Sequence, residues 1–354
     1  MKSVENNNSK NLFSFYLILG VQPGDIIFIP EFQQQLIYDF ESLSEIPGDA
    51  DTFFSFPIIP CSILQYKNFL ASYETILHLL KTNKKNKYEK VHKGTPYYLL
   101  SIGSFISDNF EKAIYYMDAA LKEDERAGND LEKTPAGLFF ELDDTKEEQA
   151  AKEIVSTIKN TLESKLQEIK SNGGPVLTIE DIKNRISKPA LSSKPELRTI
   201  VTSLLSFFYE YQSKKRLFDL TLHTEGTAEP FYLFLMKGCI IFESLIKRSD
   251  LGKRYAKTNL GEFLKEKEIY EALGFNSTPL NENVYTFINL RDLLNKQKSC
   301  KSNFVESSVI TSWSIRNLLF HSIAWPEKPT EMEFEQMHNL IIVAIVVAIS
   351  CLYQ

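Results

Sequence analysis

The spacing of apolar residues changes along the chain, and with it the predicted type of secondary structure. In residues 1–60, apolar runs such as DIIFIP and FFSFPIIP alternate with turn-forming segments such as QPGD and IPGDAD. Runs rich in isoleucine and phenylalanine between proline, glycine and aspartate are typical of short strands. From Ser62 onward, apolar residues recur every three or four positions, which indicates helices. The pattern therefore predicts a mainly α protein that begins with an α+β region.

Residues 96–124, PYYLLSIGSFISDNFEKAIYYMDAALKED, predict a helical hairpin with its turn at SDN. The hairpin resembles a single tetratricopeptide repeat at the positions Leu100, Phe110, Ala113, Tyr116, Ala120 and Leu121. The resemblance implies a peptide-binding groove. Such arrays need about three repeats to be stable, and only one copy is visible, so a helix pair inside a larger helical unit is the alternative interpretation.

Two segments mark the middle of the chain. The stretch from Asp143 to Pro175 begins with a capping aspartate, alternates charges and ends at a glycine pair, so it predicts a long, solvated helix. The segment Ser187–Leu197, SKPALSSKPEL, combines proline, serine and lysine as linkers do. We therefore predict a domain boundary there. Residues 1–190 would form a regulatory or sensor region, and residues 191–354 would form a helical bundle.

Beyond this predicted boundary, almost every residue belongs to a helical pattern. Turn-forming segments such as HTEGTAEP and AWPEKPTE separate the helices, and short connections favour an antiparallel bundle. The last apolar run, Leu340–Tyr353, is shorter than the roughly 20 residues of a membrane span, so we expect a buried final helix and no membrane partner. The helices are predicted at residues 195–216, 228–248, 259–273, 281–299, 305–323 and 331–353.

The net charge of −6 excludes a generally basic nucleic-acid-binding protein but leaves room for a local basic cleft. Residues 191–354 contain 19 lysines and arginines against 18 acidic residues, so the remaining charge of −7 lies in residues 1–190. A polyanion would therefore bind the C-terminal half. The four cysteines are far apart and have no neighbouring histidines, which favours a reducing cytoplasm over a zinc site or a disulfide scaffold. No cofactor or metal site is predicted.

The segment Trp313–Glu327, WSIRNLLFHSIAWPE, places Arg316, Asn317 and His321 in otherwise apolar sequence. Burying a guanidinium without a partner is costly, so these side chains should lie at a surface or face a partner. On a straight helix Asn317 and His321 are nearly aligned, and Arg316 lies about 140° from His321 but can still approach the imidazole, because its side chain is long and the helix is near its end. Pro326 disfavours helical geometry at the residue before it, so the helix should end close to Ser322–Ala324, which places His321 in its last turn. The helix dipole there favours a protonated imidazole, which suits acid–base chemistry.

The hexapeptide RNLLFH, on a late helix of a predicted bundle, resembles the R-x4–6-H signature of the HEPN superfamily (higher eukaryotes and prokaryotes nucleotide-binding). The upstream segment FYLFLMKGCIIFESLIKRS, which contains Glu243, and its spacing to the motif also resemble such domains, and the resemblance covers residues 195–354. It implies a metal-independent endoribonuclease that acts as a homodimer, with the motifs of two protomers forming one composite cleft. A bacterial stress, toxin or phage-defence role is what the resemblance suggests.

The resemblance also implies a role for each residue of the motif. His321 would transfer protons at the ribose 2′-hydroxyl or the leaving 5′-oxygen, and Arg316 would stabilise charge on the scissile phosphate. Asn317 would orient the histidine or bind the RNA, and Glu243 is a candidate supporting residue. Attack by the 2′-hydroxyl needs no metal ion and leaves a 2′,3′-cyclic phosphate. The N-terminal region would sense a trigger or hold the nuclease in check through a protein partner or inhibitor.

The same residues allow non-catalytic interpretations. Arg316 could pair with an acid such as Glu243 or Glu335, and His321 could cap the carbonyls at the helix end. The protein would then be an inactive HEPN-like interaction protein or a nucleotide-binding regulator.

We predict no functional role for the remaining polar residues. We expect Arg291 and Asp292 to form a pair on one helix face and YQSKKR, residues 211–216, to be a solvated helix end. No role is assigned to His78, His223 or His338.

Overall fold

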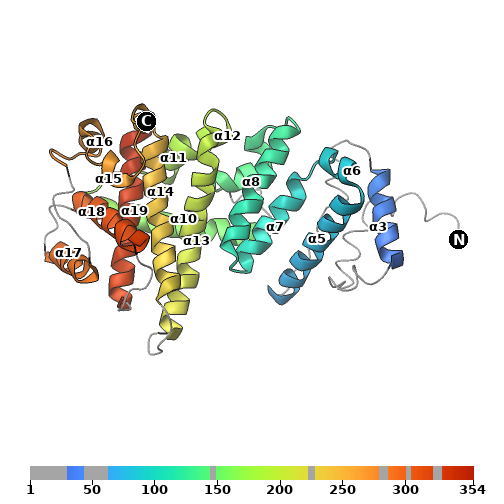
Figure 1. The fold of residues 1–354 in the computed structure, drawn as a ribbon, viewed down its shortest axis with the longest axis horizontal. Coiled ribbons are helices and arrows are strands. Elements are labelled where there is room, and N and C mark those ends of the chain that lie inside the picture. Colours follow the sequence, from blue (N-terminus) through green and yellow to red (C-terminus); the bar gives the residue numbers. More distant parts are fainter. Residues whose placement is uncertain are drawn as a thin grey trace. The chain divides into compact units, whose positions relative to one another are not determined.

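The structure is a computed structural model, and every regular element in the residues it describes is a helix (Figure 1). No strand occurs in that part of the chain. The prediction of a mainly α protein is therefore confirmed. The described residues are 30–43, 63–143, 149–221, 228–278, 286–299, 304–321 and 329–354.

The predicted α+β character of the N-terminal region is not supported. Residues Pro30–Ser42 form helix α3, within the region 1–60 that was predicted to contain short strands. Proline at the first helical position is pre-organised for a helix start, and Leu36 and Phe40, four residues apart, are both fully buried. Helical spacing therefore outweighs the β-favouring composition around it. The strand candidates FFSFPIIP and DIIFIP, apart from its final proline, lie outside the described residues.

By its internal contacts the chain divides into two compact units, residues 1–155 and residues 156–354. This division differs from the predicted boundary after residue 190. The segment predicted as a linker contains helix α12 (Lys188–Leu191) and a 3-10 turn (Pro195–Leu197), and its apolar residues are buried. Pro195 opens the 3-10 turn, but Pro189 lies inside a continuous helical stretch, in which α11 (Ile179–Ile182) leads through a π-helical turn (Lys183–Ser187) into α12. The π-helical turn interrupts the regular hydrogen-bond ladder just before the proline, which lacks an N–H donor. The composition that suggested a linker therefore occurs within packed helical structure.

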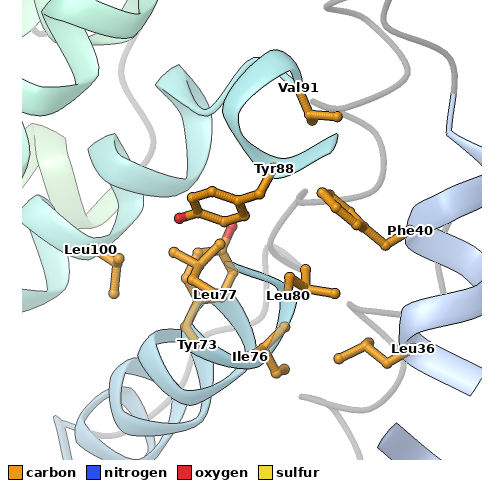
Figure 2. Packing of buried hydrophobic residues seen from close by; sticks show 9 residues of the cluster. All are labelled: Leu36, Phe40, Tyr73, Ile76, Leu77, Leu80, Tyr88, Val91 and Leu100. Atoms are coloured by element: carbon orange, nitrogen blue, oxygen red, sulfur yellow. The ribbon is translucent and has the colours of Figure 1, made fainter. Parts of the chain in front are cut away.

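The first unit packs its helices around an apolar cluster (Figure 2). Figure 2 shows Phe40 of α3 directed toward Val91 and Tyr88, and the Phe40 and Tyr88 ring centroids lie 6.4 Å apart. The cluster consists of Leu36, Phe40, Tyr73, Ile76, Leu77, Leu80, Tyr88, Val91 and Leu100. After α3 the helices are α5 (Ile63–Asn83), α6 (Lys85–Lys90), α7 (Gly94–Ile106), α8 (Phe110–Arg126) and α9 (Pro135–Phe140).

The predicted helical hairpin is confirmed as helices α7 and α8, which pack on each other. Asp108 adopts a positive φ of 55° in the turn, and Asn109 caps α8 by accepting a hydrogen bond from the Lys112 amide. Ser101 of α7 donates to the Ala113 carbonyl of α8 at 2.7 Å. The SDN turn was therefore sufficient to predict the helical hairpin. The tetratricopeptide resemblance stays a prediction.

Helix α10 (Gln149–Ser171) is the predicted long helix, but it is not solvated all round. Its charges occupy one face, and the opposite face is buried through residues at helical spacing. These residues are Ala151, Ile154, Val155, Ile158, Leu162, Leu166 and Ile169. The expectation of a solvated helix is wrong because alternating charges coexist with a complete apolar stripe.

The second unit is the predicted helical bundle. Helices α14, α18 and α19 pack on one another, α13 packs on α14, and α17 packs on α18 (Figure 1). Gly238 lets α14 approach its neighbours closely, since a Cβ there would lie 2.6 Å from both Phe207 Cζ and Ile341 Cγ2. The segment predicted at 259–273 forms two short helices instead of one. The bundle helices are α13 (Arg198–Thr221), α14 (Glu229–Arg248), α15 (Leu260–Phe263), α16 (Lys267–Ala272), α17 (Phe287–Ser299), α18 (Phe304–His321) and α19 (Glu331–Leu352).

The final helix, α19, is buried along most of its length, as predicted. Every residue from Leu340 to Ile349 is at most 4% exposed. Among the described helices, α19 is long and apolar enough to cross a membrane by length and composition, and 67% of its most apolar window is buried inside the protein. A core helix of a soluble protein passes the same test, so the length and hydropathy of α19 are weak evidence for a membrane span.

His338 of α19, which received no role from its sequence position, lies in the aromatic core of the second unit. Its side chain is fully buried, and its ring stacks on Tyr211 with the centroids 3.9 Å apart. Neither ring nitrogen makes a hydrogen bond to a described residue. Burial lowers the pKa of His338 well below the ordinary histidine value. The imidazole is therefore neutral in the folded protein at neutral pH.

Folding stability is expected to fall between about pH 7 and pH 5, and the substitution His338→Phe should remove part of this fall. Below the ordinary histidine pKa of about 6.5, the unfolded chain takes up a proton that the folded chain excludes. The folded state then loses up to about 1.4 kcal/mol per pH unit from this residue. Urea unfolding of both proteins at the two pH values measures the contribution. Equal pH slopes in wild type and variant would contradict this role of His338.

Candidate functional site

Helix α18 carries the motif residues and is described as far as His321, so the helix end predicted close to Ser322–Ala324 lies outside the described residues. Arg316 and Asn317 lie in its last two turns and are both half-buried. The His321 side chain lies outside the described part of the structure. The predicted alignment of Asn317 with the imidazole, and the approach of Arg316 to it, therefore stay predictions.

Helix α18 is buried on several sides, which explains why few of its residues are charged. Small hydroxyl residues face the interior, and Ser308 and Ser312 donate back to the carbonyls of Val305 and Ser308 at 2.6 and 2.8 Å. Such local hydrogen bonds satisfy the hydroxyl groups, so these polar side chains can be buried between packed helices. Arg316 is too long and too strongly charged for this solution, so it requires an acidic partner.

The partner of Arg316 is Glu243 of α14. Arg316 Nε lies 3.1 Å from Glu243 Oε2, and the Glu243 side chain is only 8% exposed against 17% for Arg316. Arg316 Nη1 also donates to Asn317 Oδ1 at 3.4 Å. The structure thus brings together three of the four residues selected from the sequence, in the ion pair that the non-catalytic interpretation also considered. A guanidinium anchored through Nε has a fixed orientation.

Lys247, which the sequence analysis missed, completes the cluster. Lys247 Nζ lies 2.7 Å from Glu243 Oε1, so the Glu243 carboxylate bridges two cations with its two oxygens. Lys247 Nζ also donates to the Thr258 carbonyl at 2.8 Å. Glutamate four residues before lysine on a helix is a readable signal for such a pair. We call Arg316, Glu243 and Lys247 the cation–carboxylate cluster.

A second buried carboxylate in the same unit bridges two lysines. Glu210 of α13, 7% exposed, pairs with Lys214 at 3.2 Å and with Lys237 of α14 at 2.7 Å. Lys215 lies 3.6 Å from Glu331 of α19. Both lysines stay partly exposed, but α13 continues to Thr221 and Tyr211 is buried, so the segment 211–216 is not a solvated helix end. Glu210 resembles Glu243 in burial, but its described ion pairs are with Lys214 and Lys237 and not with the arginine of the RNLLFH motif.

Arg291 does not follow the predicted pairing with Asp292. Its guanidinium pairs with Glu333, whose carboxylate also accepts from the Thr330 amide in the capping box of α19. Neighbouring residues on a helix point about 100° apart, so a bond from α17 to α19 satisfies Arg291 better than its neighbour does. Arg291 thus links α17 to the start of α19.

A polar cavity of about 360 Å³ lies in the first unit and is lined by His92, Asp124, Asn129 and Lys133 among others. His92 Nε2 lies 2.8 Å from Asp124 Oδ1, and Asn129 Nδ2 donates to the same oxygen at 3.2 Å. A Cβ at Gly94 would lie 2.3 Å from that oxygen, so glycine permits the close approach. The cluster ties the start of α7 to the end of α8, and we assign it a structural role. Nothing in the local sequence indicated this pairing.

The described residues contain no group of three or more histidines, cysteines, aspartates or glutamates placed to hold a metal ion. Cys239 is fully buried beside the Arg316 backbone, and burial raises the pKa of its thiol, so it packs as a neutral side chain. Cys61 and Cys300 lie outside the described residues. Comparisons of the chain with protein-family models, with curated proteins and with solved structures give no match.

Proposed function

We propose that the chain is a metal-independent endoribonuclease that cleaves RNA by attack of the 2′-hydroxyl at a composite Arg/His site across a homodimer. The observation that carries the proposal is the RNLLFH motif at the end of α18, with Arg316 oriented by the buried Glu243. This arrangement sets a guanidinium near a helix C-terminus, where the helix dipole stabilises an imidazolium. Both groups are suited to phosphodiester cleavage.

The proposed chemistry uses each motif residue once. His321 abstracts the 2′-hydroxyl proton or protonates the leaving 5′-oxygen, and the matching step comes from the second protomer's copy of the motif. Arg316 stabilises the negative charge that develops on the scissile phosphate. Asn317, which accepts from Arg316 Nη1, orients the histidine or binds the RNA. The products are a 2′,3′-cyclic phosphate and a 5′-hydroxyl.

The exposed face of α14 supports the proposed homodimer. Leu233 and Ile240 lie seven residues apart on one side of this helix and are 48% and 49% exposed, and Ile240 is one turn from Glu243. Large apolar side chains that repeat on an outer helix face favour association with another surface. A second copy that docks here would bring two copies of the motif region toward each other.

The substitution Ile240→Glu is expected to convert a dimer into a monomer and to reduce cleavage at low protein concentration. A charge in a two-fold interface is buried twice and costs several kcal/mol. Light scattering after size-exclusion chromatography measures the molar mass. Ile288→Glu, at an isoleucine of α17 that is 65% exposed, is the matched control and should leave the mass unchanged. A dimer that persists in Ile240→Glu would place the interface elsewhere.

The Arg316–Glu243 ion pair also suits a second candidate, an inactive HEPN-like interaction protein or nucleotide-binding regulator. In that case the pair holds α18 on α14, and the C-terminal bundle serves dimerisation or binds a nucleotide without turnover. The N-terminal unit would dock a protein partner or inhibitor under either candidate, and both would act in the cytoplasm.

Cleavage of a labelled single-stranded RNA by the purified protein in excess EDTA tests the proposal. We expect cleavage to persist in EDTA and the upstream fragment to carry a 2′,3′-cyclic phosphate, detected by its resistance to phosphatase until acid opens the ring. Cleavage that EDTA abolishes would point to a metal-dependent site. Nucleotide binding without any cleavage would favour the regulator.

A further inference from the structure

The cation–carboxylate cluster contains one more positive charge than its carboxylate neutralises. Arg316 and Lys247 each carry +1, and Glu243 carries −1, so the cluster has a net charge of +1 at neutral pH. A carboxylate shared by two cations holds both in place without cancelling them. The surplus charge favours an anion beside the cluster.

Lys247 has one more N–H donor than its two partners among the described residues use. Its ammonium group has three N–H donors, of which Glu243 Oε1 and the Thr258 carbonyl use two. The side chain is 36% exposed, twice as much as that of Arg316, so a ligand can reach the third donor. Arg248, the next residue, is exposed and adds a further positive charge at the end of α14.

Two described carboxylates lie close to Lys247 in sequence or through Thr258, and neither forms a described ion pair with it. Asp250 pairs with Lys194 at 2.8 Å, so its charge is balanced outside the cluster. Glu262 accepts hydrogen bonds from the Thr258 amide and hydroxyl and keeps its negative charge, which the positive charge of Arg248 balances in number. Lys247 therefore differs from an ordinary surface lysine, because a buried acid and a backbone carbonyl fix its position.

We propose that Lys247 is a second phosphate-binding residue of the same site, which contacts an RNA phosphate next to the one at Arg316. The proposal rests on the proposed ribonuclease function and names the ligand of Lys247 as the phosphodiester backbone of single-stranded RNA. Glu243 acts as the positioning residue for both cations. A lysine contributes charge to phosphate binding without base recognition, so the contact adds affinity irrespective of RNA sequence.

The test measures binding of a short fluorescent 2′-O-methyl RNA, which lacks the attacking hydroxyl and cannot be cleaved. Lys247→Met is expected to weaken binding about five- to tenfold near physiological salt and to lower the slope of log affinity against log salt by about 0.7. Lys247→Arg keeps the charge and should retain the wild-type slope. Lys253→Met is the matched control, because Lys253 is an exposed lysine of the same region that pairs with Glu196.

The outcomes separate this inference from the function on which it rests. If the wild type neither binds nor cleaves RNA, the proposed function fails together with the inference. If the wild type cleaves RNA but Lys247→Met and Lys253→Met have equal salt slopes, only the role of Lys247 is overturned. The same holds if Lys247→Arg behaves like Lys247→Met. Should Lys247→Met fail to fold, Lys247→Gln, which keeps hydrogen bonding without the charge, replaces it in the comparison.

Discussion

Replacing Arg316 and His321 together by alanine is expected to lower RNA cleavage by about a thousandfold or more, because general acid–base catalysis and charge stabilisation each contribute on the order of 10² or more. Residues that act as one unit are not additive, so each single variant should lose nearly as much as the pair. Growth arrest on expression should disappear with the activity. Cleavage rates under single-turnover conditions, together with growth curves, measure both effects.

The control for this prediction is Arg254→Ala, at an arginine that is 68% exposed and lies outside the cation–carboxylate cluster. Its cleavage rate should equal that of the wild type. Thermal unfolding of all variants distinguishes lost chemistry from lost folding. Cleavage or toxicity that survives the double substitution would remove the motif from the reaction and leave the interaction protein or regulator as the better candidate.

The helices of the second unit were predictable because their apolar residues repeat at helical spacing over long segments. Both ends of α14 were predicted within one residue, since proline and glycine signals flank this helix. The same reasoning failed for the N-terminal region, where short strands were predicted within residues 1–60 although Leu36 and Phe40 of Pro30–Ser42 have helical spacing. It also failed at Ser187–Leu197, where proline and serine suggested a linker but the chain is helical at Lys188–Leu191 and Pro195–Leu197.

The candidate site was predictable only where its contacts are local. Glu243 and Lys247 are one turn apart on the same helix, so their pairing could be read from the sequence. The bond between Glu243 and Arg316 joins residues 73 positions apart and depends on how α14 packs on α18. From the sequence alone, Glu243 and Glu335 were both candidate ion-pair partners of Arg316, and nothing distinguished them. Packing also decided that Arg291 bonds Glu333 across helices instead of its neighbour Asp292.

The substitution Glu243→Gln is expected to reduce cleavage about 10- to 100-fold while RNA binding becomes tighter. Glutamine keeps the shape of glutamate but removes the charge that orients Arg316 and Lys247. The net charge of the cluster then rises from +1 to +2, which favours the phosphate backbone. Stability should fall by about 1–3 kcal/mol, because a buried charge-assisted interaction is lost. Cleavage rate, RNA affinity and urea unfolding are measured on the same protein.

Glu210→Gln is the matched control that separates positioning from stability. Glu210 is as buried as Glu243 and also bridges two cations, so its substitution should cost a similar amount of stability. It does not contact the RNLLFH arginine through any described ion pair, so cleavage should be unchanged. Opposite changes in rate and affinity for Glu243→Gln, with neither for Glu210→Gln, would identify Glu243 as the residue that aims Arg316. Equal stability losses with unchanged cleavage in both variants would instead make the Arg316–Glu243 pair a structural contact between α18 and α14.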